Sequence, residues 1–215
     1  MFTKLLTWLN LAWQILRSNI RWMTWNLFLA FVPLALSVWL FRRARSRSAL
    51  WWIGALVFIA FLPNAPYVLT DIIHFVEDIR RNNYSIWIIT LILIPQYLLF
   101  IVAGFEAYVL SLINLGYYLN RQRKSKWILW VELLIHGLSA IGIYLGRFLR
   151  FNSWDLITQF ETVTGTGITI LARKRPVTVI VITFVIITSL YWLMKQVTLA
   201  LAAYQKSSKA DSSTA

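Results

Sequence analysis

The sequence predicts an all-α integral membrane protein, a helical bundle with five or six transmembrane helices. Of its 215 residues, 59% are hydrophobic and only 13% are charged, whereas about a quarter of the residues of a soluble domain are charged. Several apolar runs approach or exceed the roughly 20 residues that a helix needs to cross a bilayer core. These runs are continuous rather than alternating, which argues against barrel strands. Backbone groups in lipid must bond within the protein, and helices meet that need.

The chain opens with a short apolar run over residues 2–16, which we expect to lie in the membrane interface or to form a thin span. The polar stretch RSNIR separates it from a clear span between Trp25 and Phe41, which ends at the basic stretch RRARSR. We therefore divide the chain into three parts. They are an N-terminal helix in residues 1–23, a multi-pass membrane domain in residues 24–198, and a polar, disordered tail in residues 199–215.

The next apolar run, residues 49–62, ends at two prolines. Pro63 and Pro66 each remove a backbone donor and clash with the preceding turn, so the helix should break or kink there. Asn64 suits the N-cap of a second helical piece, and a proline is tolerated in a first turn. That piece should run from about Tyr67 to Val76.

Residues 86–119 form the longest apolar run. As one helix it would extend roughly 51 Å at about 1.5 Å per residue, which exceeds a hydrocarbon core of about 30 Å. We interpret it as a single tilted or protruding helix bent at Pro95, with a tight hairpin near Gly104 as the alternative. Further spans are expected over residues 127–145 and 177–193.

Basic residues outnumber acidic ones by 21 to 8, a formal net charge of +13. They cluster in loops beside apolar runs, where they set topology and contact anionic lipid, so we expect the bilayer and anionic headgroups as partners. A homo-oligomer or another membrane protein is a further candidate partner. Nucleic acid is not, because no nucleic-acid-binding motif is present. The loops at 42–47 and 121–126 favour the cytoplasmic side, but the triplet at 173–175 opposes them and the bias is weak.

The second helical piece carries a polar face. Tyr67, Asp71, His74 and Asp78 follow one another at intervals of four, three and four residues, which places them on one side of a helix. The opposite side is apolar, so the polar face must meet water, another helix or a ligand.

The end of the fourth long run offers a partner for this face. Gly142 and Gly146 form a small-xxx-small pair, which permits close helix approach. Arg147 and Arg150 are three residues apart and should share a face. If residues 86–119 cross once, both groups emerge on one side, which we assign as extracytoplasmic. The expected anion- or headgroup-binding site comprises Tyr67, Asp71, His74, Asp78, Arg147, Arg150, Asn152 and Asp155.

Several chemistries fit these residues. The arginines suit a phosphate, a carboxylate or a lipid headgroup. His74 could act as an acid or base oriented by Asp71 or Asp78, which makes His74 and Asp71 the candidate catalytic residues. A divalent cation is disfavoured because the arginines would oppose it, so we expect no metal and no cofactor. No nucleophile is identified, and no GxSxG, HExxH or P-loop motif occurs. The simplest alternative is an ion-pair network that only holds helices together.

A second set of ionisable residues, Glu106, Glu132 and His136, lies deep within apolar runs. Glu132 and His136 are four apart on one helix face. Groups at that depth usually face a partner or a path. They could carry protons, or they could form a hydrogen-bonded contact that fixes packing, which is the interpretation we favour.

Three stretches of the chain, NLFLAFVPLALS, LPNAPYVLTDIIHF and GIYLGRFLRFNSWD, resemble signature blocks of an uncharacterised bacterial membrane family, domain of unknown function 1361 (DUF1361). The resemblance covers most of residues 17–195. It implies a multi-pass protein of the bacterial inner membrane and no particular activity. Glu132 and His136 fall outside these blocks. The residues that fall in them are Asn64, Tyr67, Asp71, His74, Arg147, Arg150, Asn152 and Asp155.

Three functional classes remain open. The first, which we favour, is an accessory or assembly protein that binds an anion or lipid headgroup at the extracytoplasmic polar site. The second is a membrane-embedded enzyme that acts on a lipid or lipid-linked substrate with His74 as acid or base. The third is a small transporter or channel that uses Glu106, Glu132 and His136, and the absence of an internal repeat counts against a common class of such proteins.

Overall fold

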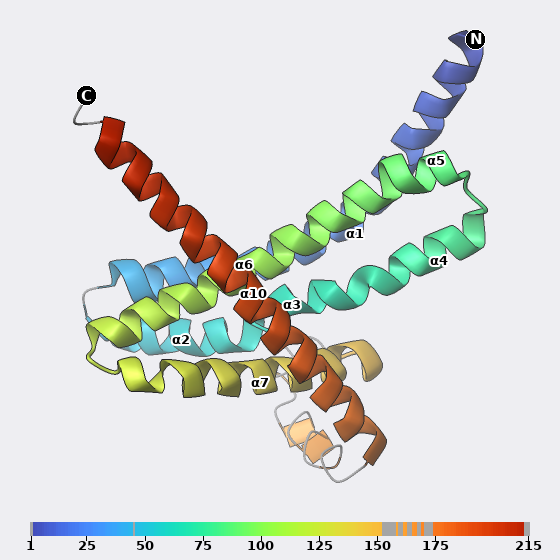
Figure 1. Cartoon of the computed structure of the whole chain (residues 1–215). Coiled ribbons are helices and arrows are strands. Elements are labelled where there is room, and N and C mark those ends of the chain that lie inside the picture. Colours follow the sequence, from blue (N-terminus) through green and yellow to red (C-terminus); the bar gives the residue numbers. More distant parts are fainter. Residues whose placement is uncertain are drawn as a thin grey trace.

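The structure, a computed structural model, describes residues 2–44, 46–151 and 174–212, with a few isolated positions between 158 and 169. This part of the chain contains helices and no strand. Five helical stretches are long and apolar enough to cross a membrane: Leu6–Arg43, Ala49–Asn82, Ile86–Arg121, Ser125–Phe148 and Lys174–Lys209. The predicted all-helical membrane bundle is confirmed (Figure 1), and the described part of the chain holds five candidate spans.

The first span consists of α1 (Phe2–Ser37) and a π-helical extension, η1 (Val38–Arg43). The expectation of a separate helix over residues 2–16 is wrong, because α1 continues through residue 23 without a break. The polar interruption does not end the helix because Asn19, only 7% exposed, faces a hydrogen-bonding partner inside the protein. Because α1 crosses once, Lys4 lies on the side of the membrane opposite the basic loop at 42–47. This position further weakens the difference in basic residues between the two sides, which is the basis for assigning the cytoplasmic side.

The second span breaks at the prolines, as the sequence predicts. α2 (Ala49–Phe61) begins at the N-cap Ser48, and it is followed by the single turn α3 (Asn64–Tyr67), the 3₁₀ turn η2 (Val68–Asp71) and α4 (Ile72–Asn82). The proposed N-cap role of Asn64 is wrong, since Pro63 holds that position. Asn64 instead donates from its amide to the carbonyl of Phe61, at the end of α2.

The third span is a single crossing, and the alternative of a hairpin near Gly104 is wrong. α5 (Ile86–Ile88), η3 (Ile89–Leu93) and α6 (Ile94–Arg121) follow one another directly. Pro95 directly follows the π-helical turn η3, and the helix continues through it. Gly104 has a packing role, because a Cβ there would lie 2.8 Å from a methyl carbon of Val68.

The last two spans are the short turn η4 (Ser125–Trp127) with α7 (Ile128–Phe148), and α10 (Lys174–Ser212). α10 extends into the tail that was expected to be disordered, and its described residues are helical up to Ser212. Alanine and leucine dominate residues 199–203, and both are strong helix formers.

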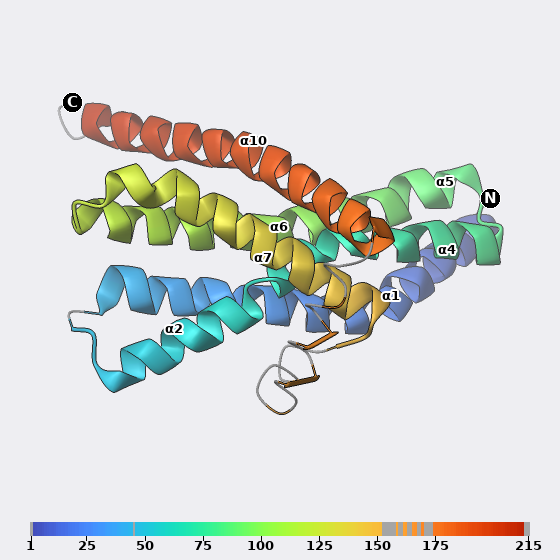
Figure 2. The same cartoon turned by 90° about the horizontal axis from the view of Figure 1, so that it is seen from below.

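The helices form a bundle in which α1 packs along α6 and α2, while α10 packs mainly on α7 (Figure 1). The largest buried side chains include Tyr97, Phe105 and Tyr108 of α6 and Leu40 of η1. The two termini lie at opposite ends, with the 42–47 and 121–126 loops at the C-terminal end (Figure 2). At the other end, α1, α4 and α5 continue past the end of α7 (Figure 2).

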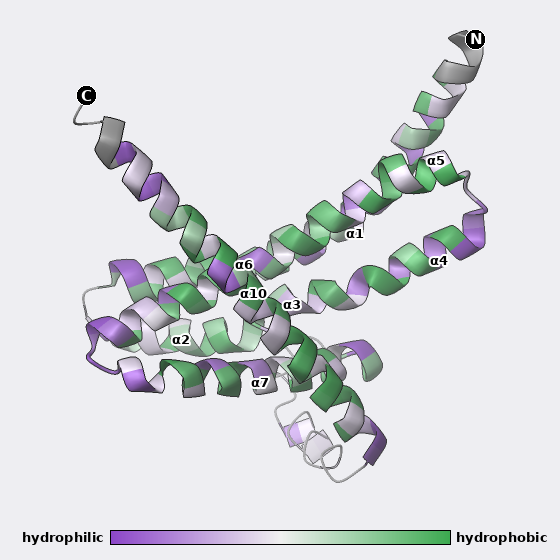
Figure 3. Ribbon diagram, viewed as in Figure 1, coloured by the Kyte–Doolittle hydropathy of each residue, from purple (hydrophilic) through white to green (hydrophobic). Residues whose placement is uncertain are grey.

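Hydrophobic residues make up most of every span (Figure 3), and each span has large apolar side chains that are exposed. Trp25, Leu56, Leu99, Leu134 and Val185, one from each span, are all more than half exposed. A soluble protein rarely exposes so much apolar surface, whereas a protein that crosses a bilayer must. The chain is an integral membrane protein with several crossings.

Candidate functional site

The first candidate site forms where α7 meets the proline turn of the second span. A Cβ on Gly142 would lie 2.9 Å from the Cβ of Pro63, and one on Gly146 would lie 3.4 Å from the ring of Tyr67. The small-xxx-small pair therefore lets α7 approach α3 more closely than larger residues would allow. This approach places the end of α7 beside Asp71.

Arg147 at the end of α7 faces Asp71 at the end of η2. Its Nη1 lies 3.5 Å from Asp71 Oδ1 and donates to the Tyr67 hydroxyl at 3.3 Å. Its Nη2 donates to the backbone carbonyl of Thr70. The side chain of Asp71 is 1% exposed and that of Arg147 is 20% exposed, so this ion pair is largely removed from solvent.

Asp71 has two further neighbours, one of them on α1. Asn26 donates to Asp71 Oδ2 at 2.8 Å. His74 Nε2 lies 3.8 Å from Oδ1, which is too long for a hydrogen bond, and Oδ1 has no hydrogen-bond partner among the described residues. The His74 side chain is 43% exposed; its Nδ1 lies 3.9 Å from Glu77 and its ring 5.0 Å from that of Trp22. We call Asn26, Tyr67, Thr70, Asp71, His74 and Arg147 the Asp71–Arg147 site.

Asp78, the last member of the predicted polar face, has separate partners. Asn19 of α1 and the Tyr97 hydroxyl of α6 donate to its Oδ2 at 3.1 and 2.9 Å. These bonds tie α4 to α1 and α6. The sequence reasoning missed Asn19, Asn26 and Tyr97, although an amide within an apolar run is itself a signal, because a buried polar group needs a partner.

Arg150 does not share a face with Arg147, and that expectation is wrong. α7 ends at Phe148, and Arg150 adopts a left-handed backbone conformation with φ 61°. The side chain of Arg150 is exposed and makes no hydrogen bond or ion pair with residues that the structure describes. Asn152 and Asp155 lie outside the described residues.

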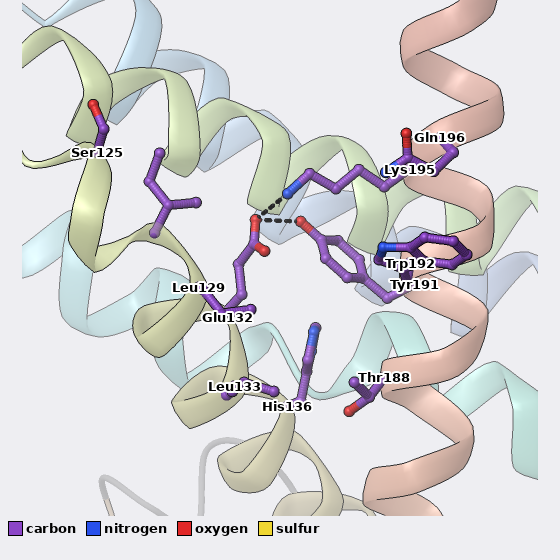
Figure 4. Close-up of a pocket in the computed structure, with 11 residues that line it drawn as sticks. Ser125, Leu129, Glu132, Leu133, His136, Thr188, Tyr191, Trp192, Lys195 and Gln196 are labelled. Carbon is purple, nitrogen blue, oxygen red and sulfur yellow. Dashed lines mark hydrogen bonds and ion pairs between the residues drawn. The ribbon is translucent and has the colours of Figure 1, made fainter.

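The second candidate site brings α10 against the deep acids of α6 and α7. Glu132 Oε1 accepts hydrogen bonds from the Tyr191 hydroxyl and from Lys195 Nζ, both at 2.6 Å (Figure 4). Glu106 accepts one from Thr198 at 2.7 Å. The partners of both acids, which the sequence reasoning missed, thus lie on α10, where Tyr191, Lys195 and Thr198 recur at helical spacing.

His136 is paired with α6 rather than with an acid. Its Nδ1 lies 2.8 Å from the hydroxyl of Tyr108, which also lies 3.3 Å from Ser139 Oγ. The ring of Tyr191 lies 4.7 Å from the His136 ring. The deep polar residues therefore form two adjacent hydrogen-bonded clusters, one at Glu132 and one at His136.

A cavity of about 360 Å³ lies between α7 and α10 beside these groups. We call it the α7–α10 pocket. Figure 4 shows Glu132, Tyr191 and Lys195 meeting at its centre, with His136 and Thr188 nearby. It is lined by Ser125, Ile128, Leu129, Glu132, Leu133, His136, Thr188, Tyr191, Trp192, Lys195 and Gln196.

An apolar layer separates the two candidate sites. Ser139, Ile143 and Arg147 lie four residues apart on one face of α7, and Ile143 is 3% exposed. No hydrogen bond between described residues links the Ser139 cluster to Arg147 across it. A continuous polar path across the bundle therefore gains no support.

The chemistry of both sites is that of ion pairs, hydroxyls and imidazoles. In the parts of the chain that the structure describes, no three histidine or carboxylate side chains are grouped to hold a metal ion. The Asp71–Arg147 site combines a guanidinium, a partly exposed imidazole and the carboxylate of Asp71, and a second carboxylate, that of Glu77, lies beside His74. Such a set can bind an oxyanion or transfer a proton.

Comparison with known proteins agrees with the sequence blocks noted above. No curated protein and no solved structure matches the chain. A protein family described as "Protein of unknown function (DUF1361)" matches residues 25–189, which include the whole Asp71–Arg147 site. The chain belongs to the DUF1361 family of proteins of unknown function.

Proposed function

We propose that this membrane protein is an accessory or assembly protein that binds a phosphate-bearing lipid headgroup, or a free oxyanion, at the Asp71–Arg147 site. The observation that carries the proposal is the fixed position of Arg147. Asp71, Tyr67 and Thr70 hold its guanidinium at the end of α7 while a fifth of the side chain stays exposed. As the resemblance to DUF1361 implies, we place the protein in the inner membrane of a bacterium with this site outside the cytoplasm.

Arg147 keeps donors for a ligand. A guanidinium has five N–H groups in a planar fork that fits phosphate. Asp71, Tyr67 and Thr70 face its two terminal nitrogens, and no described contact uses Nε. Arg150, three residues further along the chain, adds charge, and the half-buried His74, 3.8 Å from Asp71, adds a further donor.

The carboxylates of this region do not cancel the attraction for an anion. Asp71 is paired with Arg147, and Glu77 lies 3.6 Å from Arg81. Asp78 accepts hydrogen bonds from the neutral Asn19 and Tyr97 and keeps its charge. Arg80 and Arg150, which have no ion-pair partner in the described structure, outnumber this one carboxylate and leave the described residues of the region with a small excess of positive charge.

The surroundings of the site favour a lipid over a soluble anion. Phe148 and Leu149, which directly follow Arg147 at the end of α7, are exposed apolar side chains. A lipid whose acyl chains contact them would present its phosphate to Arg147, and an arginine suits phosphate better than a lysine does.

A membrane-embedded enzyme is a second candidate because His74 lies between two carboxylates, 3.8 Å from Asp71 and 3.9 Å from Glu77. A histidine in that position can accept and release a proton of a bound lipid or lipid-linked substrate. Changing His74 to Gln separates the two candidates: lipid binding should persist in either case, and only an enzyme would lose turnover.

The proposal is tested by native mass spectrometry of the full chain in detergent, titrated with phosphatidylglycerol, with a neutral diacylglycerol and with inorganic phosphate. We expect Arg150→Gln and Arg147→Lys each to weaken phosphatidylglycerol binding about tenfold. Arg43→Gln, an equal charge change at the other end of the bundle, should have little effect. Competition by inorganic phosphate would identify a free oxyanion as the ligand. Equal affinity of all three variants and the native chain would overturn the proposal.

A further inference from the structure

We propose that the α7–α10 pocket binds one anionic phospholipid, with its phosphate at the basic loop before α7 and its ester region beside Lys195. This is a second site, at the opposite end of the bundle from the Asp71–Arg147 site. It rests on three observations: a cavity that opens toward lipid, a polar centre with unused donors, and an uncompensated basic loop at the mouth.

The pocket is accessible from the lipid side. Leu129 and Trp192, which line it on α7 and α10, are 61% and 64% exposed. Both belong to membrane spans, so their exposed surfaces face acyl chains rather than water. An occupant can thus enter sideways from the bilayer, and the cavity of about 360 Å³ has room for a glycerol ester and the first part of a chain.

The polar centre of the pocket can accept an uncharged polar group. Lys195 uses one donor on Glu132, and no described residue accepts from its other two. The Lys195–Glu132 pair has no net charge, so it would not repel an anionic lipid. The ester carbonyl oxygens of a phospholipid could accept hydrogen bonds from the two N–H groups of Lys195 that Glu132 does not use.

The basic loop supplies the charge complementarity. Ser125 lines the pocket and lies between Lys124 and Lys126, so the mouth of the pocket is part of this loop. Arg121 and Arg123 complete a group of four exposed bases, and none forms an ion pair with an acid that the structure describes. Basic clusters beside helix pairs attract anionic headgroups by about 1 kcal/mol for each Lys or Arg.

The depths of these features match the order of groups along a phospholipid. Glu132 lies about 10 Å below Ser125 along α7, at about 1.5 Å per residue. A phosphate at the loop would therefore place ester groups near Lys195, and the chain would run past Leu133 and Trp192. An ion pair that served only to tie α10 to α7 would need neither the cavity nor the basic mouth.

The test is native mass spectrometry of the full chain with phosphatidylglycerol, phosphatidylcholine and inorganic phosphate. Two variants target the site: Lys124→Gln with Lys126→Gln removes charge at the mouth, and Leu129→Trp fills the pocket. Two variants are matched controls: Lys206→Gln with Lys209→Gln removes the same charge from the end of α10, and Leu134→Trp adds the same bulk at a residue 63% exposed outside the pocket.

We expect the two mouth substitutions together to weaken phosphatidylglycerol binding at this site about thirtyfold and Leu129→Trp to weaken it about tenfold, whereas each control should change it less than twofold. Phosphatidylcholine should bind more weakly to the native chain than phosphatidylglycerol does. If the mouth variant and the charge control at the end of α10 lost phosphatidylglycerol affinity equally, the attraction would be non-specific and the proposal would be overturned. Unchanged phosphatidylglycerol affinity of Leu129→Trp would overturn it too. Competition by inorganic phosphate alone would replace the lipid with a free anion. Native mass spectrometry counts the lipids on each chain, so the native chain should hold two phosphatidylglycerol molecules, and the mouth variant and the Arg150→Gln variant should each lose one of them. A variant that combines both sets of substitutions should lose both lipids, which separates this site from the Asp71–Arg147 site.

Discussion

Arg147 Nη1 lies 3.5 Å from Asp71 Oδ1, so an ion pair joins the end of α7 to the helical segment that follows the two prolines. Gly142 and Gly146 favour this pair, because they let α7 approach α3 closely. Its geometry therefore depends on both spans.

The first prediction concerns the charge of Asp71. Asp71→Asn removes the anionic partner of a largely buried guanidinium, which we expect to lower the free energy of unfolding by about 3 kcal/mol. Glu77→Gln is the matched control, because Glu77 pairs with Arg81 at the surface and such pairs contribute about 0.5 kcal/mol or less. The measurement is reversible unfolding in mixed micelles. Similar stability of the two variants would show that the Asp71–Arg147 pair contributes little.

The second prediction concerns close packing at Gly142. In Gly142→Ala the new Cβ would lie 2.9 Å from Pro63 Cβ, and a proline ring cannot move aside. We therefore expect the free energy of unfolding to fall by about 1–3 kcal/mol. Gly137→Ala is the control on the same helix, since a Cβ there meets no atom within 4 Å. It should be neutral or slightly stabilising, because alanine favours helix. Equal effects in the two variants would contradict the packing argument.

Much of the fold could be predicted from the sequence. Run length and hydropathy determine the spans, and Pro63 produces the expected end of α2 at Phe61. The errors occur where a tertiary partner overrides a local signal. Asn19 lies in a polar stretch that looks like a boundary, yet Asp78 satisfies it and α1 continues.

The candidate site was predictable only in part. Helical spacing places Asp71 and His74 on one face, and the two glycines indicate which helix approaches. Spacing alone could not reveal that Asp78 bonds to Asn19 and Tyr97, because that depends on the rotation of α1 and α6 about their axes. Nor could it reveal that α7 ends before Arg150.

The third prediction concerns the coupling of Glu132 and Lys195 within the membrane. Lys195→Met removes the cationic partner of Glu132 and leaves Tyr191 as its hydrogen-bond donor. We expect the free energy of unfolding to fall by about 2–3 kcal/mol. Glu132→Gln combined with Lys195→Met removes both charges, so the double variant should be more stable than the sum of the single losses predicts. A double-mutant cycle on unfolding free energies measures this difference. Strict additivity would mean that the two side chains do not interact.

The fourth prediction concerns topology, and the absence of cysteine makes it direct. With five crossings, the loop before α5 and the end of α7 face one compartment, whereas the loop before α2 and the end of α10 face the other. We expect an impermeant thiol reagent to label Ser85→Cys and Leu149→Cys from one side of sealed vesicles, and Ser46→Cys and Ser207→Cys only from the opposite side. All four positions are exposed, so differences in labelling report sidedness rather than burial. Labelling of positions 85 and 149 from opposite sides would require α5 to α7 to cross differently, and it would separate His74 from Arg147.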